Sequence, residues 1–525
     1  MITTIIWYLY KFIDIHAMAF YDTGKNIIVF RVLHWCGIYF ALYIVKEFIA
    51  KWHEKGVQRR LRWSLIFGVI VGSVFLFVWP GTWSWDDVFI YTSALHYDLY
   101  PWQHFLTSIF HIMSLQMIPL AGGVVCVQIC IASLIAGECI VSVVECIELH
   151  GMKRVVAESI LLVSMLSLPV VTYLFSGFRM GIYSYLELLY LAKIFCFMRR
   201  EKCITMKEVI LIIALTALVS SWRTEGIYYL VILPIIIYML YQKRSISKKQ
   251  GIGVVISAVL LTIFIAGYNN KLIGNNDYSL TATIVPVVAI LKDESAQVTQ
   301  EELGELDRVI NLDVVKQNAI FKAEELFYMG LVRDNYTKQE YYNYLKTYIK
   351  IILKNPDTAL ESMTEIFLQT AGVKFIDNRT LQRTVVVNTA GGTLRLYDNN
   401  TMHALSFLQM KIPMKYPIIS QESRNSAILR MSCINSDGTV RPSYYVCWNL
   451  IIPLILMMIC IIGTVVKRNK ILFIILTSIV IRTLILFFTS CAPYIMYYIS
   501  VYLLAYFWSF VFIFETLLKK KEVFA

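Results

Sequence analysis

A segment from Trp79 to Pro119 holds the residue types most capable of chemistry in this chain, and it follows a long apolar run. The segment contains no Lys or Arg, but it carries three aspartates and three histidines among many aromatic residues: Asp86, Asp87, Asp98, His96, His104 and His111. An acid without a salt-bridge partner is available as a general base. Paired acids just outside an apolar span, followed by a half-apolar aromatic stretch, predict a site at a membrane surface where a lipid-linked substrate would be met.

The acids and histidines of this segment each have a second interpretation. Asp86 and Asp87 are adjacent, so on a helix their side chains point about 100° apart and cannot form one symmetric pair. Asp86 is either the base or an acid favoured at the positive N-terminal end of a helix. His104 either orients an acceptor or a phosphate, or lies solvated at the interface. Trp85 and Trp102 are the aromatic residues that we expect at an acceptor or sugar site.

Three arginines complete the set of candidate residues. Arg179 and Arg223 are the only basic residues in the short connections on the predicted outer side. A guanidinium offers a fork of donors that matches phosphate oxygens, although lipid head groups or helix carbonyls are alternative partners. Arg482 lies about midway along an apolar run, where a charge is a functional hypothesis by default. A structural partner such as Glu187 or Glu138 is the open alternative for Arg482.

Other kinds of site find little support. No spacing of His, Cys, Asp and Glu resembles a zinc site, and no Gly-rich phosphate loop is present. We therefore predict no metal, no cofactor and no nucleic-acid partner. Most of the eleven cysteines lie inside apolar runs and behave as small hydrophobic residues. Only Cys433, Cys447 and Cys491 could face an oxidising side, and their spacing suggests no disulfide framework.

The composition defines the class of protein. Hydrophobic residues make up 58% of the 525 residues and charged residues 16%, and the mean hydropathy is +0.62. Several apolar runs reach the length of about 20 residues that crosses a bilayer. The chain is thus predicted to be an all-α polytopic membrane protein. Lys11, Asp14 and His16 interrupt the first apolar run, so we expect no cleavable signal there. Residues 1–20 either form a twelfth span or lie at the interface.

The uneven distribution of the net charge of +12 predicts the topology. Short cytoplasmic loops collect Lys and Arg, and six basic clusters separate the apolar runs. The clusters are Lys51 to Arg62, Lys153-Arg154, Arg199 to Lys202, Lys243 to Lys249, Lys467 to Lys470 and Lys519 to Lys521. The predicted spans are 27–49, 63–79, 122–146, 155–175, 181–198, 206–221, 226–242, 252–268, 447–466, 471–490 and 494–516. They alternate without conflict if 104–119 lies along the interface instead of crossing.

Three parts of the chain follow from this topology. Residues 1–268 form an N-terminal transmembrane module with a first outer loop at 80–121, and 447–525 form C-terminal transmembrane helices. Residues 269–446 form one extracytoplasmic domain. Its section 298–356 is predicted to be helical, with a cap at Thr299 and a stop at Asn355 before Pro356. We expect loops and a short hairpin from 372 to 445.

Three short motifs carry a resemblance to a known superfamily. They are Pro-Gly-x-x-Ser-x-Asp at 80–86, Pro-x-x-His at 101–104 and Arg-x-x-Gly at 223–226. Together they resemble the GT-C superfamily, polytopic glycosyltransferases that use polyprenyl-phosphate sugars. The nearest likeness is to a bacterial branch similar to the aminoarabinose and protein O-mannosyl transferases. The likeness continues in VVAILKDESAQVTQEELGELDRVI and APYIMYYISVYLLAYF, so it covers nearly the whole chain.

The resemblance implies a fold and a reaction. The fold would be a GT-C-like bundle of 11–12 transmembrane helices, with an interfacial helix in the first outer loop and one mainly helical extracytoplasmic domain. The protein would be an inverting glycosyltransferase of the bacterial cytoplasmic membrane, with its site on the extracytoplasmic face. It would move a sugar from a polyprenyl-phosphate donor to a glycan, lipid or protein acceptor in cell-surface glycan assembly, in contact with membrane lipids.

Roles for individual residues follow by position. Asp86 matches the proposed catalytic base of the superfamily, with Asp87 as an extra acid. Arg223 matches its outer arginine, and Arg179 and Arg482 are the further candidates for the donor phosphate. The chain departs from the superfamily in two places. Tyr100-Pro101 replaces the usual His-Pro, and the segment SGFRMGIYSY offers no second acid, which argues against a bridging metal.

Two other function classes remain open. A polysaccharide polymerase or ligase also has about a dozen spans and a large outer loop, but it would hold its key arginines and histidine in that loop. A lipid-linked glycan flippase would show broken helices and charge pairs inside the membrane. A scaffold that kept the fold and lost the activity is a third alternative, because fold alone does not fix function.

Overall fold

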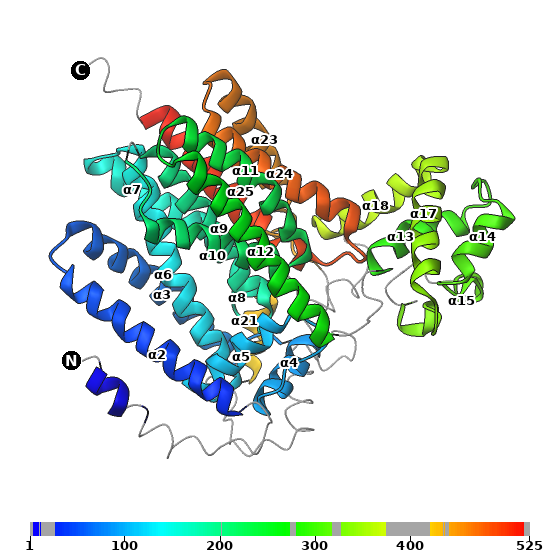
Figure 1. The fold of residues 1–525 in the computed structure, drawn as a ribbon, viewed down its shortest axis with the longest axis horizontal. Helices are drawn as coiled ribbons and strands as arrows, with labels where there is room; N and C mark the ends of the chain where they lie inside the picture. Colours follow the sequence, from blue (N-terminus) through cyan, green and yellow to red (C-terminus); the bar gives the residue numbers. More distant parts are fainter. Residues whose placement is uncertain are drawn as a thin grey trace. The chain divides into compact units, whose positions relative to one another are not determined.

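The computed structural model describes residues 4–9, 11, 27–83, 85–200, 202–273, 280–317, 327–373, 421–433, 435 and 440–518. Every regular element in these ranges is a helix, and the β-pairing is limited to two isolated bridges. The predicted all-α class is therefore confirmed for the described part of the chain (Figure 1). Most of 1–20 and most of the segment 372–445 lie outside the described residues, so the predictions made for them stay predictions.

Nine helical segments in the described ranges are long and apolar enough to cross a membrane. They are α2 (Ile27–Ala50), α3 (Lys55–Val78), α6 (Ala121–Ile147), α9 (Arg179–Arg199), η1 with α11 (Thr224–Gln242), α12 (Lys248–Ile273), α22 with α23 (Tyr444–Val466), α24 (Lys470–Thr489) and η4 with α25 (Ile495–Leu518). The pair α7 (Gly151–Ser164) and α8 (Leu168–Leu174) is bent by 65° and makes a tenth if it is one span. The chain is thus an integral membrane protein.

One predicted span, 206–221, forms a helix with the predicted bounds but is too short to be a candidate span by length. The helix α10 (Met206–Ser221) has 16 residues, and about 20 residues are needed to cross the hydrocarbon core of a bilayer. The helix begins at a capping box in which Thr205 and Glu208 satisfy each other's backbone N–H groups. This capping box fixes the start of the helix at Met206. The described part therefore holds nine or ten candidate spans where the sequence predicted eleven.

The helix α5 (Phe105–Met117) does not cross, as predicted for 104–119. Its 13 residues span roughly 20 Å, against about 30 Å for the hydrocarbon core. Its polar side chains are nevertheless buried in the protein: Thr107, Ser108, His111, Ser114 and Gln116. The polar face of α5 is therefore covered by neighbouring helices, which the weak amphipathic pattern did not predict.

The chain divides into two compact units. Unit 1 comprises Met1–Gly274, Leu381–Arg482 and Tyr498–Ala525, and unit 2 comprises Asn275–Thr380 and Thr483–Tyr497. Unit 2 begins close to the predicted boundary at 269. The helix α21 (Gln421–Met431), in contrast, packs with α3 in unit 1, although its residues fall in the predicted domain 269–446.

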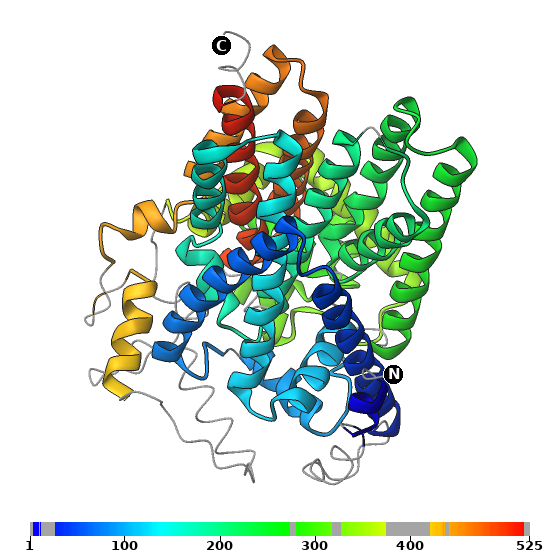
Figure 2. The same ribbon diagram turned by 90° about the vertical axis from the view of Figure 1, so that its left-hand side faces the viewer.

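Unit 1 is built on α6, which packs antiparallel to α3 and parallel to α9. Arg60 near the start of α3 contacts Glu138 and Glu145 in the second half of α6. Trp79, which follows α3, lies against Gly122 in the first turn of α6. We call the end where α3 begins and α6 and α9 end the basic end, and the opposite end the loop end. Figure 2 shows the same helices from the side.

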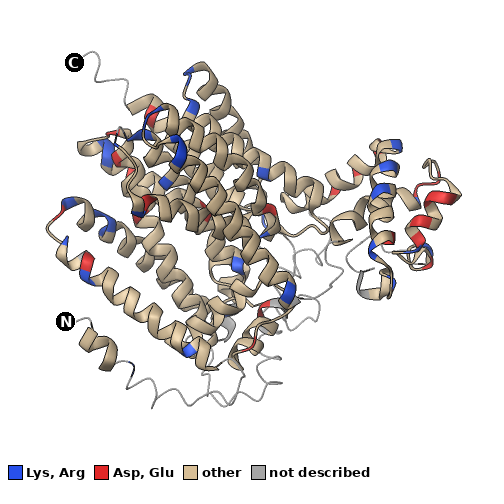
Figure 3. Ribbon diagram, viewed as in Figure 1, with Lys and Arg blue, Asp and Glu red and all other residues tan. Residues whose placement is uncertain are grey.

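Five of the six basic clusters meet at the basic end. The Arg59–Glu145 pair at 3.2 Å brings the cluster before α3 to the end of α6. Lys153 reaches Leu518 O at 3.3 Å, and Lys243 reaches Met198 O at 2.6 Å. Glu515 joins the remaining two clusters, since it contacts Arg199 at 2.5 Å and Asn469 at 3.0 Å. The helix ends that carry these five clusters thus lie together, as the charge pattern predicted, and Figure 3 marks Lys and Arg residues in blue. The sixth cluster, Lys519 to Lys521, lies outside the described residues.

Unit 2 is helical in its described residues. Its elements are α13 (Thr281–Lys292), α14 (Gln300–Asp307), α15 (Leu312–Gln317), η3 (Phe327–Leu331), α17 (Lys338–Lys354) and α18 (Pro356–Thr370). The predicted cap at Thr299 is confirmed, because its side chain accepts from Glu302 N in a capping box. The helix α17 ends at Lys354 as expected. Pro356 then begins the next helix at a position where its missing N–H costs nothing.

Candidate functional site at the loop end

The first outer loop is pinned to the segment that precedes α9. Thr82 N donates to Phe175 O at 2.8 Å. Gly81 has φ +110°, and a Cβ atom there would lie 2.3 Å from Phe175 O, so only glycine fits. The buried ring of Trp83 covers Gly177, where a Cβ atom would meet the ring at 2.5 Å. Two segments about 95 residues apart therefore act as one structural element.

Buried polar side chains hold the segment before α9 in place. Gln128 on α6 donates to Leu174 O at 2.8 Å and to Ser176 O at 3.1 Å. His111 on α5 lies 2.9 Å from Gly177 O through its Nε2 atom. Burial lowers the pKa of His111 to about 4, although the hydrogen bond with Gly177 opposes that shift. These contacts position Arg179 as the first residue of α9.

Arg179, His104 and Arg223 come together at the loop end from three separate segments. Arg179 Nη1 donates to Trp222 O at 3.4 Å, directly before Arg223. Trp222 Nε1 donates to Thr107 Oγ1 at 3.0 Å, which places the first turn of α5 beside the same segment. Burial and then the Arg179 cation lower the pKa of His104 to about 3. His104 is therefore neutral near pH 7 and can serve as a hydrogen-bond partner but not as a cation.

His104 also has a structural task. It is the N-cap of α5, and its Nδ1 atom accepts from Leu106 N at 3.3 Å. The next residue, Phe105, donates its backbone N–H to Asn269 Oδ1 at 3.0 Å and packs against Tyr268 at the end of α12. His104 is only 8% exposed. It is therefore a buried capping residue close to Arg179, which differs from a solvated interfacial histidine.

Arg223 belongs to a buried ionic network. Arg223 Nε lies 2.5 Å from Glu225 Oε1, and Arg482 Nη2 lies 3.5 Å from the same oxygen. Arg482 also forms an ion pair with Glu187, and neither side chain is exposed. The structural partner left open for Arg482 is thus present and is Glu187. Glu138 instead pairs at the basic end, with Lys193 at 2.5 Å and Arg60 at 3.1 Å.

The two aspartates lie in the first turn of α4 (Trp85–Leu95). The side chain of Asp87 is fully buried. The side chains of Asp86 and Trp85 lie outside the described residues, so their proposed roles stay predictions. Trp102 is half-buried in the connection that leads to His104. A carboxylate in a first helical turn is stabilised by the helix dipole, and this term favours the ionised form that a general base requires.

Three residues of the loop end were missed from the sequence. Glu225 and Trp222 flank Arg223 within two residues, and an acid at the start of an apolar span was a signal that could have found the first. Arg424 on α21 had no such signal. Its Nε donates to Trp79 O and its Nη2 to Gly81 O, both at 2.8 Å, from more than 340 residues away. A contact of that sequence separation leaves no local pattern.

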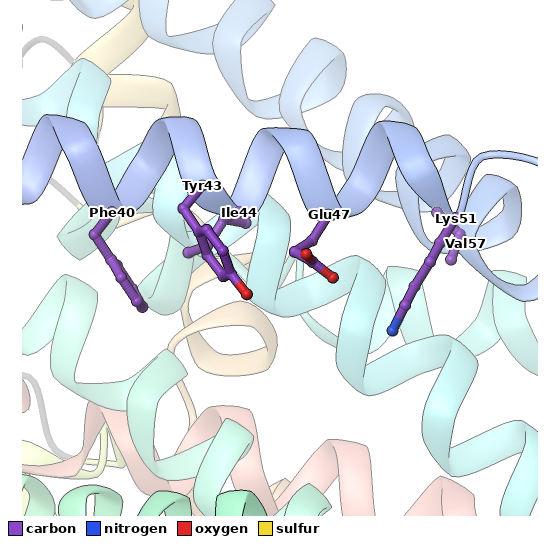
Figure 4. Close-up of a pocket in the computed structure, with 6 residues that line it drawn as sticks. All are labelled: Phe40, Tyr43, Ile44, Glu47, Lys51 and Val57. Atoms are coloured by element: carbon purple, nitrogen blue, oxygen red, sulfur yellow. The ribbon is translucent and has the colours of Figure 1, made fainter. Parts of the chain in front are cut away.

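Metal clusters and cavities give little guidance at this end. Among the described residues, no group of three or more His, Cys, Asp and Glu side chains is arranged to hold a metal ion. One apolar groove of about 230 Å³ lies along α2, on the side toward the basic end (Figure 4). Its lining residues are Phe40, Tyr43, Ile44, Glu47, Lys51 and Val57. None of these is a candidate site residue, so the groove is separate from the loop-end cluster.

Comparisons of the chain with models of protein families, with curated proteins and with solved structures found no match. The class of protein therefore rests on the fold, which is an all-α polytopic integral membrane protein. Within that class, the loop-end cluster of Arg179, Arg223 and His104 is the site to be explained.

Proposed function

We propose that the protein is a membrane glycosyltransferase that moves a sugar from a polyprenyl-phosphate donor to an acceptor. The observation that carries the proposal is the convergence of Arg179, His104 and Arg223 from three segments at the end opposite the basic clusters. Lys and Arg mark the cytoplasmic side of short loops, so this end faces the extracytoplasmic side. The motif likeness to the GT-C superfamily supports the same orientation and the same substrate class.

In the proposed reaction an acidic side chain accepts a proton, and basic side chains stabilise the negative charge of the leaving group. Asp86 takes the proton of the acceptor hydroxyl, whose oxygen forms the new bond to the anomeric carbon. The bond from that carbon to the phosphate oxygen breaks, and the polyprenyl phosphate leaves with the electron pair. Arg223, with Arg179, stabilises the growing negative charge of the leaving phosphate. Attack from the face opposite the phosphate inverts the anomeric carbon, and Trp85, Trp102 and His104 contact the sugar or the acceptor.

The ionic network assigns different tasks to the two buried arginines. Arg482 is fully buried and holds Glu187 and Glu225. Arg223 is 7% exposed and binds Glu225 through Nε, and its Nη1 lies 2.7 Å from Met180 Sδ. A phosphate reaches Arg223 more easily than Arg482. We therefore assign phosphate contact to Arg223 and Arg179, and a supporting position to Arg482.

Sugar transfer by the purified full chain tests the proposal. Wild type is incubated in detergent with a panel of polyprenyl-phosphate sugars and acceptors, beside Asp86→Asn and Asp87→Asn. Asp86→Asn keeps the volume and removes the charge, so it should abolish transfer while donor binding persists. Transfer that survives in Asp86→Asn but is lost in Asp87→Asn would identify the buried Asp87 as the base. Absence of transfer and of binding with every donor would contradict the proposal.

A flippase for lipid-linked glycans is the second candidate. Two observations favour it: the ion pairs of Arg482 with Glu187 and Glu225 inside the bundle, and the 65° break between α7 and α8. Buried charge pairs and broken helices are features of transport proteins. Reconstituted protein that moves a labelled lipid-linked glycan between leaflets, without forming a glycosidic bond, would favour this candidate over the transferase.

A further inference from the structure

Two pairs of cysteines lie close together within unit 1. Trp448 Nε1 donates to Met431 O at 3.1 Å, which brings Cys447 beside Cys433, and Cys196 Sγ donates to Ser142 O at 3.5 Å, one turn before Cys146. All four are free thiols in the structure. A disulfide requires a sulfur–sulfur distance of about 2.05 Å and Cβ atoms about 3.8 Å apart. Cysteines held side by side can approach this distance by side-chain rotation, so both pairs are candidates for a bond.

The Cys433–Cys447 pair is held by the surrounding backbone. Arg441 N donates to Cys433 O at 2.9 Å, and Trp448 Nε1 donates to Met431 O at 3.1 Å. These two hydrogen bonds join the chain around Cys433 to the chain that leads to Cys447 and follows it. Cys433 is buried and Cys447 is partly exposed, so an external reagent can reach the second sulfur.

The two pairs lie at opposite ends of unit 1. Cys433 follows α21, whose Arg424 binds the carbonyl groups of Trp79 and Gly81 at the loop end. Cys146 lies in the last turn of α6, and Cys196 lies one turn before the end of α9. Cys146 and Cys196 therefore belong to the basic end. Opposite ends of a membrane-spanning bundle face opposite redox compartments, because only the extracytoplasmic side favours disulfides.

We propose that Cys433 and Cys447 form a disulfide in the mature protein, whereas Cys146 and Cys196 remain thiols. The inference rests on the orientation given under the proposed function and is independent of transferase activity. The oxidant is a thiol–disulfide oxidoreductase in its disulfide form on the outer side. The Cys447 thiolate attacks that disulfide, and the Cys433 thiolate then displaces the oxidant from the mixed disulfide. Two electrons pass to the oxidant, which leaves as a dithiol with the two protons.

The bond would tie the residues after α21 to the end of α22 (Tyr444–Cys447), directly before α23 (Ile451–Val466). Arg424 on α21 holds the first outer loop through Trp79 O and Gly81 O, both at 2.8 Å. The disulfide would therefore stabilise the position of α21, which holds this loop. The spacing of the cysteines suggests no disulfide framework, and one isolated bond of this kind has no spacing signature.

Trapping of free thiols at lysis tests the inference on the wild-type full chain. Cells are lysed in excess N-ethylmaleimide, and the denatured protein is digested without a reducing agent. Trypsin alone leaves both cysteines in one peptide, because Arg441 precedes Pro442. A second protease that cuts before Asp437 separates them into peptides 431–436 and 437–467. Cys447→Ser is the matched variant, since it leaves Cys433 without its partner sulfur.

The expected result is that the two peptides are joined and that Cys460 in peptide 437–467 carries N-ethylmaleimide. Apart from that adduct, the mass should be lower by two hydrogen atoms than the sum of the free thiol forms. In the same sample, Cys146 and Cys196 should both carry N-ethylmaleimide, and Cys433 should become alkylated in Cys447→Ser. Alkylation of both Cys433 and Cys447 in wild type would overturn the inference. A bond between Cys146 and Cys196 would overturn it as well. Transfer activity is not used, so failure of the proposed function does not affect this result.

Discussion

The two ends of unit 1 use arginine in different ways. At the basic end, Arg59 contacts Glu145 and Glu158, and Arg60 contacts Glu138 and Glu145. At the loop end, Arg223 and Arg482 share Glu225. The side chains of Arg59 and Arg60 are 20% and 30% exposed, whereas those of Arg223 and Arg482 are 7% and 0% exposed.

This difference in exposure predicts a difference in how much each ion pair contributes to stability. Exposed ion pairs contribute about 0–1 kcal/mol each, because water and salt screen them. A buried charge that loses its partner costs about 3–5 kcal/mol. The exposed pairs of Arg60 at the basic end therefore tolerate the loss of a single charge, and they connect the helix ends of the bundle. At the loop end each charge depends on its neighbours.

Removal of one member of the Arg482–Glu187 pair should have the largest effect. Glu187→Gln leaves Arg482 with only Glu225, so we expect a loss of about 3–5 kcal/mol of stability. The loss is measured as a lower midpoint of thermal unfolding in detergent. The double variant Glu187→Gln with Arg482→Met removes both charges and should recover most of it. Arg60→Gln at the basic end should lower the midpoint by an amount equivalent to about 1 kcal/mol or less. Equal losses at the two ends would contradict the comparison.

Arg223→Gln at the loop end should lower the rate of sugar transfer, whereas a substitution at the basic end should not. Loss of a group that stabilises charge in the transition state lowers kcat by about 10²–10³-fold. The substituted amide retains a hydrogen-bonding group for Glu225, which limits the structural damage. The measurement is initial rates of sugar transfer at saturating donor, with Arg60→Gln as the control near the wild-type rate. A wild-type kcat in Arg223→Gln would remove this residue from the reaction.

Arg424→Gln should loosen the first outer loop. The variant loses two hydrogen bonds from a charged donor to Trp79 O and Gly81 O. A hydrogen bond to a charged group contributes about 1.5–3 kcal/mol. Amide hydrogen exchange should therefore rise in 79–83 and stay unchanged in the basic-end segment of α3. Unchanged exchange of the loop would show that the contacts with α9 suffice to hold it.

Two glycine substitutions compare a tightly packed position with an open one. In Gly177→Ala the new methyl group meets the Trp83 ring at 2.5 Å, and overpacking of this kind costs about 1–3 kcal/mol. A Cβ atom added at Gly72 on α3 would have no neighbouring atom within 4 Å, so Gly72→Ala should stabilise the helix by about 0.5–1 kcal/mol. Thermal unfolding of both variants measures the effects. A neutral Gly177→Ala would mean that the first loop can move away from the segment before α9.

Unit 2 offers a pH-dependent pair as a smaller test. Burial alone would raise the pKa of Glu302, but hydrogen bonds from Lys354, Thr299 and Lys350 outweigh it and lower the pKa to about 2. A lowered carboxyl pKa stabilises the fold above about pH 4.5, and that contribution is lost as the pH falls toward 2. Hydrogen exchange of α14 and α17 should differ between wild type and Glu302→Gln at pH 6, and the difference should shrink as the pH falls below 4.5 toward 2. A difference that is as large at pH 2 as at pH 6 would exclude ionisation as its cause.

Local signals in the sequence predicted much of the fold. The apolar runs predicted most of the spans, and Thr299 and Lys354 mark helix ends that the structure confirms. The basic clusters predicted which helix ends lie together. These features depend on residues within one or two turns of each other, so a single sequence contains them.

Contacts between distant segments account for what the sequence did not reveal. The ion pair of Arg482 with Glu187 could be named only as one of two alternatives, because both glutamates lie in apolar runs. Arg424 had no signal, since its partners are carbonyl groups of Trp79 and Gly81. The burial of the polar side chains of α5 likewise depends on helices that arrive later in the chain.

Binding of polyprenyl phosphate without a sugar tests the central claim most directly, because it requires the phosphate site but no chemistry. Titration of wild type, Arg223→Gln and Arg60→Gln in detergent gives the Kd of each. The account predicts that Arg223→Gln weakens binding by roughly tenfold or more, while Arg60→Gln binds like wild type. Unchanged binding by Arg223→Gln, with weaker binding by Arg60→Gln, would place the phosphate at the basic end and contradict the account.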